Sequence, residues 1–189
     1  TGGWYINGLF TNMTWVGGTP VDNDRVVINA NGAAITMGGD PLILKTLRIK
    51  GNNSVSYLGT LTITDSLIIE GTSALPGQVS FSSGTYSIKD IILSTSDADG
   101  ALFQTDGTVA LSMTGSIIKN SNGSVTISSG TSFNLSGTSN QTIYGSGFVL
   151  GLTGKTAGTV NLGSDYSTSG AVSIPSGVTL NTNSFTLSG

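Results

Sequence analysis

Hydrophobic and polar residues alternate in short runs along the whole chain. Turn-forming pairs such as Gly-Asn, Ser-Gly and Asp-Gly separate these runs. The runs include residues 25–28, 61–63, 125–127, 160–162 and 185–187. Alternation with a period of two is typical of a strand with one buried face and one face in water. No run is long enough to indicate a helix, so the sequence predicts an all-β protein.

The spacing between strand-like runs is about nine residues, which fits two architectures. One is an antiparallel β-sandwich, and the other is a single-stranded parallel β-helix, or β-solenoid. The solenoid is favoured because the inward triplets are small and alike (Val-x-Ile, Val-x-Leu, Phe-x-Leu), as stacking at about 4.8 Å requires. Outward residues such as Thr60, Thr62 and Thr64 suit hydrogen-bonded ladders along a stack. We predict about seven rungs of about 25 residues each.

The length of 189 residues predicts one continuous domain, 1–189. Within it we expect an N-terminal cap segment, 1–24, and a β-solenoid, 25–189. The cap prediction depends on aromatic residues near the start: Trp4, Tyr5, Phe10 and Trp15. We interpret them as a plug over the open end of the core. The alternative interpretation is a platform on which sugar rings stack.

Composition excludes several kinds of catalysis. The chain has no His and no Cys, which rules out Ser-His-Asp and Cys-His chemistry and the usual zinc sites. Glycoside hydrolysis needs two carboxyl groups, and Glu70 is the single Glu. We interpret Glu70 as a solvated strand end. The sequence therefore predicts no enzyme, no catalytic residue and no cofactor.

The charge pattern also limits the partners. The formal net charge is −3, and the seven Lys and Arg residues are scattered, so no basic stripe suits nucleic acid. No apolar run approaches the roughly 20 residues that cross a bilayer, so we expect no membrane insertion. More than a quarter of the residues are Ser or Thr, but 37% are hydrophobic. The chain therefore has enough apolar surface to form a buried core, which disordered chains lack.

Two short loops carry acidic residues that suit Ca²⁺. Asp22 and Asp24 lie beside a turn, and Asp97 and Asp99 precede Gly100 in a D-x-D-G sequence. Carboxylate oxygens are ligands that Ca²⁺ prefers. Neither loop completes the twelve-residue calcium pattern, and Asp in Gly-rich turns commonly caps the turn itself. Both are weak candidate metal sites.

The opening of the chain resembles a known kind of module. Its features are Trp15, the Gly-Gly-Thr-Pro turn at 17–20, the strand at 26–28 and the Ile-Lys-Gly end at 49–51. Together they are similar to the start of β-solenoid modules in large secreted bacterial surface proteins and adhesins of the Bacteroidetes type. The tail, residues 141–187, resembles the rung repeats of the same modules. The resemblance implies a structural or adhesive role outside the cell or on its surface, with neighbouring domains or surface glycans as partners.

The ends of the chain suggest a further hypothesis. The chain begins at Thr1 without Met and stops at Gly189 directly after a strand. We expect either a segment of a longer protein or an end that pairs with another copy. In the second case Phe185 and Leu187 would contact the first rung of a neighbour and build a head-to-tail fibre.

Two other functions stay open from the sequence. The first is a carbohydrate-binding or polysaccharide-degrading β-helix. The second, more remote, is ice binding, because Thr60-x-Thr62-x-Thr64 resembles the flat threonine ladders of ice-binding solenoids. In the sequence this motif is not obviously repeated from rung to rung.

Overall fold

The computed structural model of the chain describes residues 3–6, 23–29, 34–51, 53–71, 76–95, 100–120, 122–168 and 170–189. For residues 3–6, 37–40, 94 and 95 it describes the backbone. All helices and strands assigned in these ranges are β-strands. They are β1 (Gly3–Ile6), β2 (Asp24–Ile28), β3 (Ala34–Ile49), β4 (Ser54–Gly71), β5 (Gly77–Thr95), β6 (Ala101–Thr105), β7 (Val109–Met113), β8 (Ile117–Lys119), β9 (Gly123–Thr126), β10 (Thr131–Gly137), β11 (Gln141–Ile143), β12 (Val149–Lys155), β13 (Gly158–Leu162), β14 (Tyr166–Ser167), β15 (Val178–Asn181) and β16 (Leu187–Ser188).

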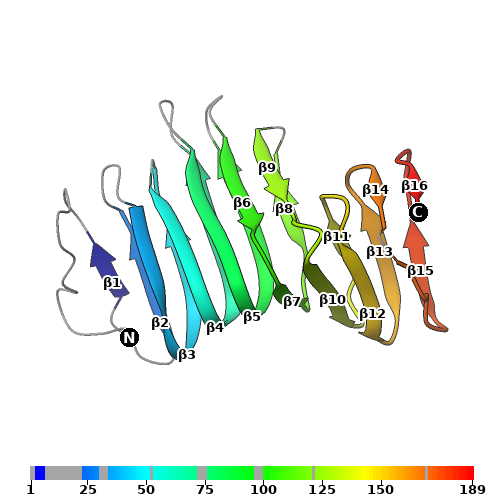
Figure 1. Cartoon of the computed structure of the whole chain (residues 1–189), viewed down its shortest axis with the longest axis horizontal. Coiled ribbons are helices and arrows are strands. Elements are labelled where there is room, and N and C mark those ends of the chain that lie inside the picture. Colours follow the sequence, from blue (N-terminus) through cyan, green and yellow to red (C-terminus); the bar gives the residue numbers. More distant parts are fainter. Residues whose placement is uncertain are drawn as a thin grey trace.

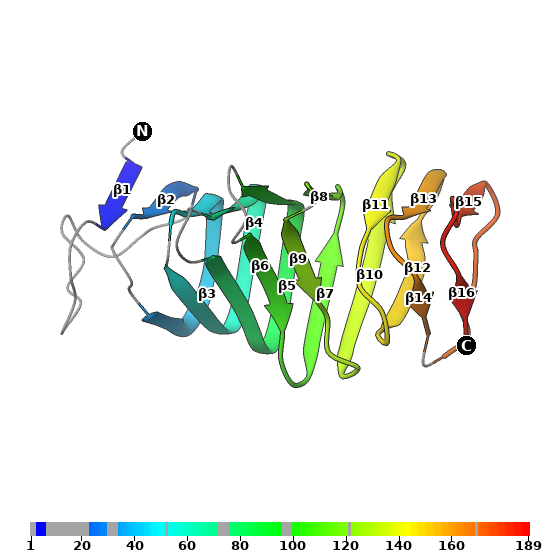
Figure 2. The same cartoon turned by 90° about the horizontal axis from the view of Figure 1, so that it is seen from above.

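The strands wind into a parallel β-solenoid of about seven turns. Each described strand pair is parallel, from β1 with β2 to β14 with β16. Figures 1 and 2 show the strands side by side along the long axis, with β1 at one end and β16 near the other. The predicted solenoid is confirmed, and the alternative antiparallel sandwich is wrong, because a sandwich of hairpins needs antiparallel pairs.

Each turn of the coil has three faces. The long strands β3, β4 and β5 bend round all three, whereas later turns use a separate strand for each face. The first face carries β6, β9, β14 and β16, the second β7, β10 and β12, and the third β8, β11, β13 and β15. β2 pairs with the last part of β3, and β1 pairs with β2, so both strands belong to the third face.

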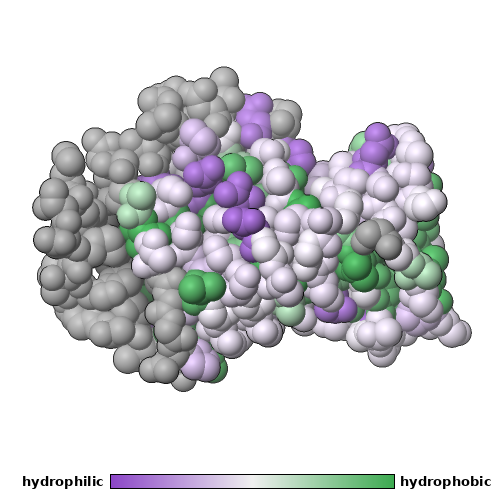
Figure 3. All heavy atoms as spheres, in the orientation of Figure 1, coloured by the Kyte–Doolittle hydropathy of each residue, from purple (hydrophilic) through white to green (hydrophobic). Residues whose placement is uncertain are grey.

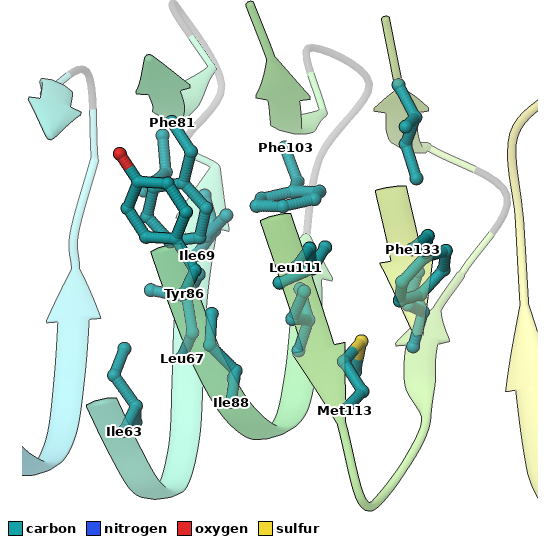
Figure 4. Close-up of a cluster of buried hydrophobic side chains, with 14 of the residues drawn as sticks. Ile63, Leu67, Ile69, Phe81, Tyr86, Ile88, Phe103, Leu111, Met113 and Phe133 are labelled. Carbon is teal, nitrogen blue, oxygen red and sulfur yellow. The ribbon is translucent and has the colours of Figure 1, made fainter. Parts of the chain in front are cut away.

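The core consists of columns of like residues, one from each turn. On the second face one column is Leu61, Tyr86, Leu111, Phe133 and Leu150. The first four of these are completely buried. Figure 4 shows Tyr86, Leu111 and Phe133 directed into this interior. Stacking identical inward positions at the strand spacing keeps apolar area out of water on every turn, which is the main stabilising term.

Glycines permit close packing where the coil turns between its first and second faces. Gly59 has a φ of 124°, in the region that favours glycine. Gly84, one turn later, lies so close that a Cβ placed there would come within 2.1 Å of the Gly59 carbonyl oxygen. Only glycine therefore fits at position 84.

The coil shortens towards its C-terminal end. Tyr86 pairs with Leu111, 25 residues further on, as the sequence predicts for one rung. Phe133 pairs with Leu150, only 17 residues further on. At this level the third-face strands β8 and β11 are no longer paired with each other, and β9 pairs only with β6. Only the second face keeps its ladder, through β7, β10 and β12.

Candidate functional sites

The predicted calcium ligands lie mostly outside the described residues. Asp24 is the first residue of β2. Asp22, Asp97 and Asp99 are outside the described ranges. Among the residues that are described, no group of three or more acidic side chains could hold a metal ion. Calcium binding at either loop stays a prediction.

The predicted aromatic cap is only partly visible. Trp4 and Tyr5 occupy β1, where they are in register with Val26 and Val27 of β2. The backbone of β1 therefore extends the third-face ladder by one strand. Their side chains, and all of Trp15, lie outside the described part, so capping and sugar stacking both stay predictions.

Glu70 contacts a cation across the third face. Its two carboxylate oxygens accept hydrogen bonds from Arg48 Nε (2.9 Å) and Arg48 Nη2. A two-pronged arginine contact holds a carboxylate in a fixed orientation. This geometry gives Glu70 a structural partner one turn away, in place of the solvated strand end that the sequence suggested.

No protein family model, no curated protein and no solved structure matches this chain. The functional argument therefore depends on the geometry. In the described part of the chain no helix is long and apolar enough to span a membrane.

Threonine and serine side chains form an array on the outward side of the second face, which we call the hydroxyl face. Thr60 and Thr62 of β4 are in register with Thr85 and Ser87 of β5. The same two columns continue in β7 and β10. The continuing residues are Ala110, Ser112, Ser132 and Asn134. The register thus aligns four strands of the array. The residues in one column are 25 positions apart from Thr60 to Thr85 and from Thr85 to Ala110, and 22 positions apart from Ala110 to Ser132.

The hydroxyl face is regular and uncharged. Its side chains repeat about every 4.8 Å along the stack and about 6.7 Å along each strand. Each of its eight positions is neutral, and behind it the inward residues Leu61, Tyr86 and Leu111 are fully buried. Because the packed core holds the backbone, the array is rigid.

The C-terminal end of the solenoid exposes residues that continue buried columns. Tyr166 is 2% exposed, but Leu187, which pairs with it one turn later, is 42% exposed. Phe185 is also exposed, at 36%. Leu187 and Val172 border a groove at this end. Figure 3 shows apolar patches towards the same end of the molecule. Phe185 and Leu187 are thus exposed apolar residues on the last described turn, and their contact with another chain stays a prediction.

A second groove lies where the ladders of the first and third faces are interrupted. Lys119, Ser124, Tyr144, Ser146 and Asp165 line it. The ammonium of Lys119 lies 4.9 Å from the centre of the Tyr144 ring. On the next turn Gly163 packs against the same ring, where a Cβ would come within 2.2 Å. Because both neighbours contact the ring, it is poorly placed to stack on a sugar.

Polar groups are also buried in the core. Thr105 Oγ1 and Thr131 Oγ1 are 2.7 Å apart, and both side chains are buried. Lys155 is 1% exposed, and its Nζ donates a hydrogen bond to the Ser139 carbonyl (2.6 Å). Burial lowers the pKa of Lys155 from its usual value. Nothing in the alternating pattern of the sequence marks this lysine as an inward residue.

Proposed function

We propose that this chain is a structural or adhesive β-solenoid module of an extracellular or cell-surface protein. The observation that carries the proposal is the parallel ladder, whose hydrogen bonds run along the long axis of the molecule. Continuous buried columns reinforce it, so the module acts as a stiff spacer. The resemblance of residues 4–51 and 141–187 to bacterial surface solenoids of the Bacteroidetes type supports the location and the role.

The open C-terminal end gives the proposal a specific contact. Strands β15 and β16 each pair with a neighbour on one side only. Unpaired strand edges with exposed apolar side chains are a template for another strand. We propose that a further parallel rung covers Phe185 and Leu187, supplied by a second copy head to tail or by a neighbouring domain of a longer chain.

Electron microscopy across a dilution series, paired with sedimentation, tests the head-to-tail version. Filaments with an axial repeat of one solenoid length are expected, and Leu187→Ser is expected to shorten or abolish them. Val149→Ser is the matched control, because Val149 is 43% exposed but lies on the second face. Monodisperse short rods at all concentrations would contradict self-assembly and leave the neighbouring domain as the partner.

Ice binding is the second candidate, and the hydroxyl face favours it. A flat, rigid and uncharged array of hydroxyl and methyl groups can order water in a lattice-like pattern. Thermal hysteresis that is lost in Thr62→Lys but kept in Ser80→Lys, on the first face, is the expected result. Equal activity of both variants, or none in the parent chain, would exclude this role. Retention of the chain on insoluble polysaccharide would instead favour the carbohydrate-binding alternative.

A further inference from the structure

Two segments face each other at the level where the ladders are interrupted. Residues 117–126, which include β8 and β9, lie on one side. Residues 141–148, which include β11, lie on the other. Among the described strands, neither β8 nor β9 pairs with a strand of the following turn. On the third face the ladder stops after β8, and on the first face it stops after β9. Because β9 follows β8 along the chain, these two interruptions form one continuous gap across both faces. We call it the ladder break. In Figure 3 the molecule is narrower in its middle part.

Side chains take over the role of the backbone ladder at this break. Gln141 is fully buried, and its Nε2 donates hydrogen bonds to the carbonyls of Gly115 (2.9 Å) and Met113 (3.3 Å). The Thr142 amide donates to Ser116 Oγ (3.1 Å). The Gln141 Oε1 atom is buried without a hydrogen-bond partner. A buried acceptor without a partner destabilises the folded state, so this bridge is weaker than the ladder that it replaces.

The aromatic part of the core divides at the same level. Before the break, Phe81 stacks on Tyr86 with ring centres 4.1 Å apart and contacts Phe103 edge to face at 5.4 Å. After it, Phe148 contacts Phe133 at 5.3 Å and Tyr166 at 4.9 Å. The two groups thus form separate aromatic clusters within one hydrophobic core, and the second cluster includes Phe133 of β10.

We propose that the ladder break is a hinge at which the rod yields, so that the solenoid unfolds as two units. The first unit contains β2 to β9 and the second contains β11 to β16. Among the described strands, the backbone ladder that joins them is the one on the second face, through β10. In a stacked protein, stability is close to a sum of units and interfaces, so the weakest interface separates cooperative blocks. The mechanical meaning of the hinge rests on the proposed structural role, but its existence does not.

Hydrogen exchange of the whole chain in increasing urea tests the proposal. Amides of β11, β13 and β15 are expected to lose protection together, at a lower urea concentration than those of β3, β4 and β5. Their protection factors without urea are expected to be lower by about tenfold or more. A single transition shared by all these strands would overturn the hinge.

An engineered disulfide provides the matched comparison, because the chain has no cysteine of its own. Ser116→Cys with Thr142→Cys closes the break and is expected to move the lower transition towards the upper one. Ser87→Cys with Ser112→Cys joins two adjacent turns on the intact second face and is expected to leave the separation unchanged. An equal effect of both disulfides would contradict a weak point at the break.

A second variant keeps the test independent of disulfide formation. Gln141→Leu removes both hydrogen bonds that the Gln141 side chain donates across the break. It is expected to reduce the urea concentration at which the second unit unfolds and to leave that of the first unit unchanged. If it lowers both transitions equally, the two halves form one cooperative unit and the proposal is wrong. Filament formation is measured separately, so failure of the hinge and failure of the proposed assembly give different results.

Discussion

The hydroxyl of Tyr86 lies 2.8 Å from the backbone oxygen of Tyr57, on the preceding turn of the coil. The same hydroxyl is 2.6 Å from the carbonyl oxygen of Ser82. Its ring also contacts the Tyr57 ring edge to face, with ring centres 6.0 Å apart, so one side chain joins a turn of the solenoid to its neighbour by both packing and hydrogen bonding.

Tyr86→Phe is therefore expected to destabilise the fold by about 1 to 2 kcal/mol, because it keeps the ring but leaves buried carbonyls without their donor. Urea denaturation followed by circular dichroism measures this change. Tyr144→Phe is the control, because Tyr144 is half-buried and its ring contacts do not depend on the hydroxyl. An equal loss in both variants would show that the Tyr86 hydroxyl has no special role.

Alkaline pH is expected to unfold the protein progressively between about pH 10 and pH 12. Burial, reinforced by the neighbouring Tyr57, raises the pKa of Tyr86 to about 12. Burial also raises the pKa of Tyr57 and of Tyr166. Tyrosines of the unfolded chain titrate near about pH 10, so the folded state holds these protons more strongly. The resulting stability is complete below about pH 10 and is lost as the pH rises towards the folded value.

Tyrosinate absorbance and circular dichroism, recorded together, test this expectation. The buried tyrosines should ionise only as the β-sheet signal is lost. Ionisation of all five tyrosines near pH 10 with an unchanged sheet signal would contradict it.

Gly84→Ala is expected to destabilise the protein by several kcal/mol or to prevent folding. The added Cβ would lie 2.1 Å from the Gly59 carbonyl oxygen, and that atom belongs to a backbone held by the ladder on both sides. Gly170→Ala is the matched control, because no atom lies within 4 Å of the place that its added methyl group would take. Thermal unfolding of the two variants compares them. Similar melting temperatures would mean that the stack can widen at Gly84.

Lys155→Met is expected to stabilise the protein at neutral pH by about 1 kcal/mol, because it replaces a buried ammonium with an apolar chain of similar length. Burial lowers the pKa of Lys155, so the unfolded chain binds this proton more strongly and stability rises with pH below the usual value. The advantage of the variant should therefore shrink as the pH approaches about 10.

Urea midpoints at several pH values measure the effect of Lys155→Met. Lys89→Met is the control, since Lys89 is 52% exposed and its ion pairs with Asp65 and Asp90 lie at the surface. A stability loss in Lys155→Met that is constant with pH would show that the bond to Ser139 outweighs the cost of burying the charge.

Much of the fold could be predicted because the alternation of hydrophobic and polar residues is visible within each short stretch of sequence. Val160, Leu162 and Ile143 are inward residues in strands whose alternation is visible in a few residues of sequence. The candidate sites were less predictable. Phe185 and Leu187 could be named as candidate contact residues from their position in the sequence. The pairing of Glu70 with Arg48 could not, because it depends on a turn of the coil that brings together residues 22 positions apart.

The sequence by itself determined that the chain forms short strands with small apolar residues inside and hydroxyl residues outside. Only the tertiary structure decided which residues of successive turns stand in line, because register depends on the exact length of every intervening loop. That register creates the Thr60, Thr85 and Ala110 column, and it also separates β8 from β11 where the coil shortens. A change of a few residues in one loop leaves the local pattern intact, yet it moves every later side chain relative to the turn below.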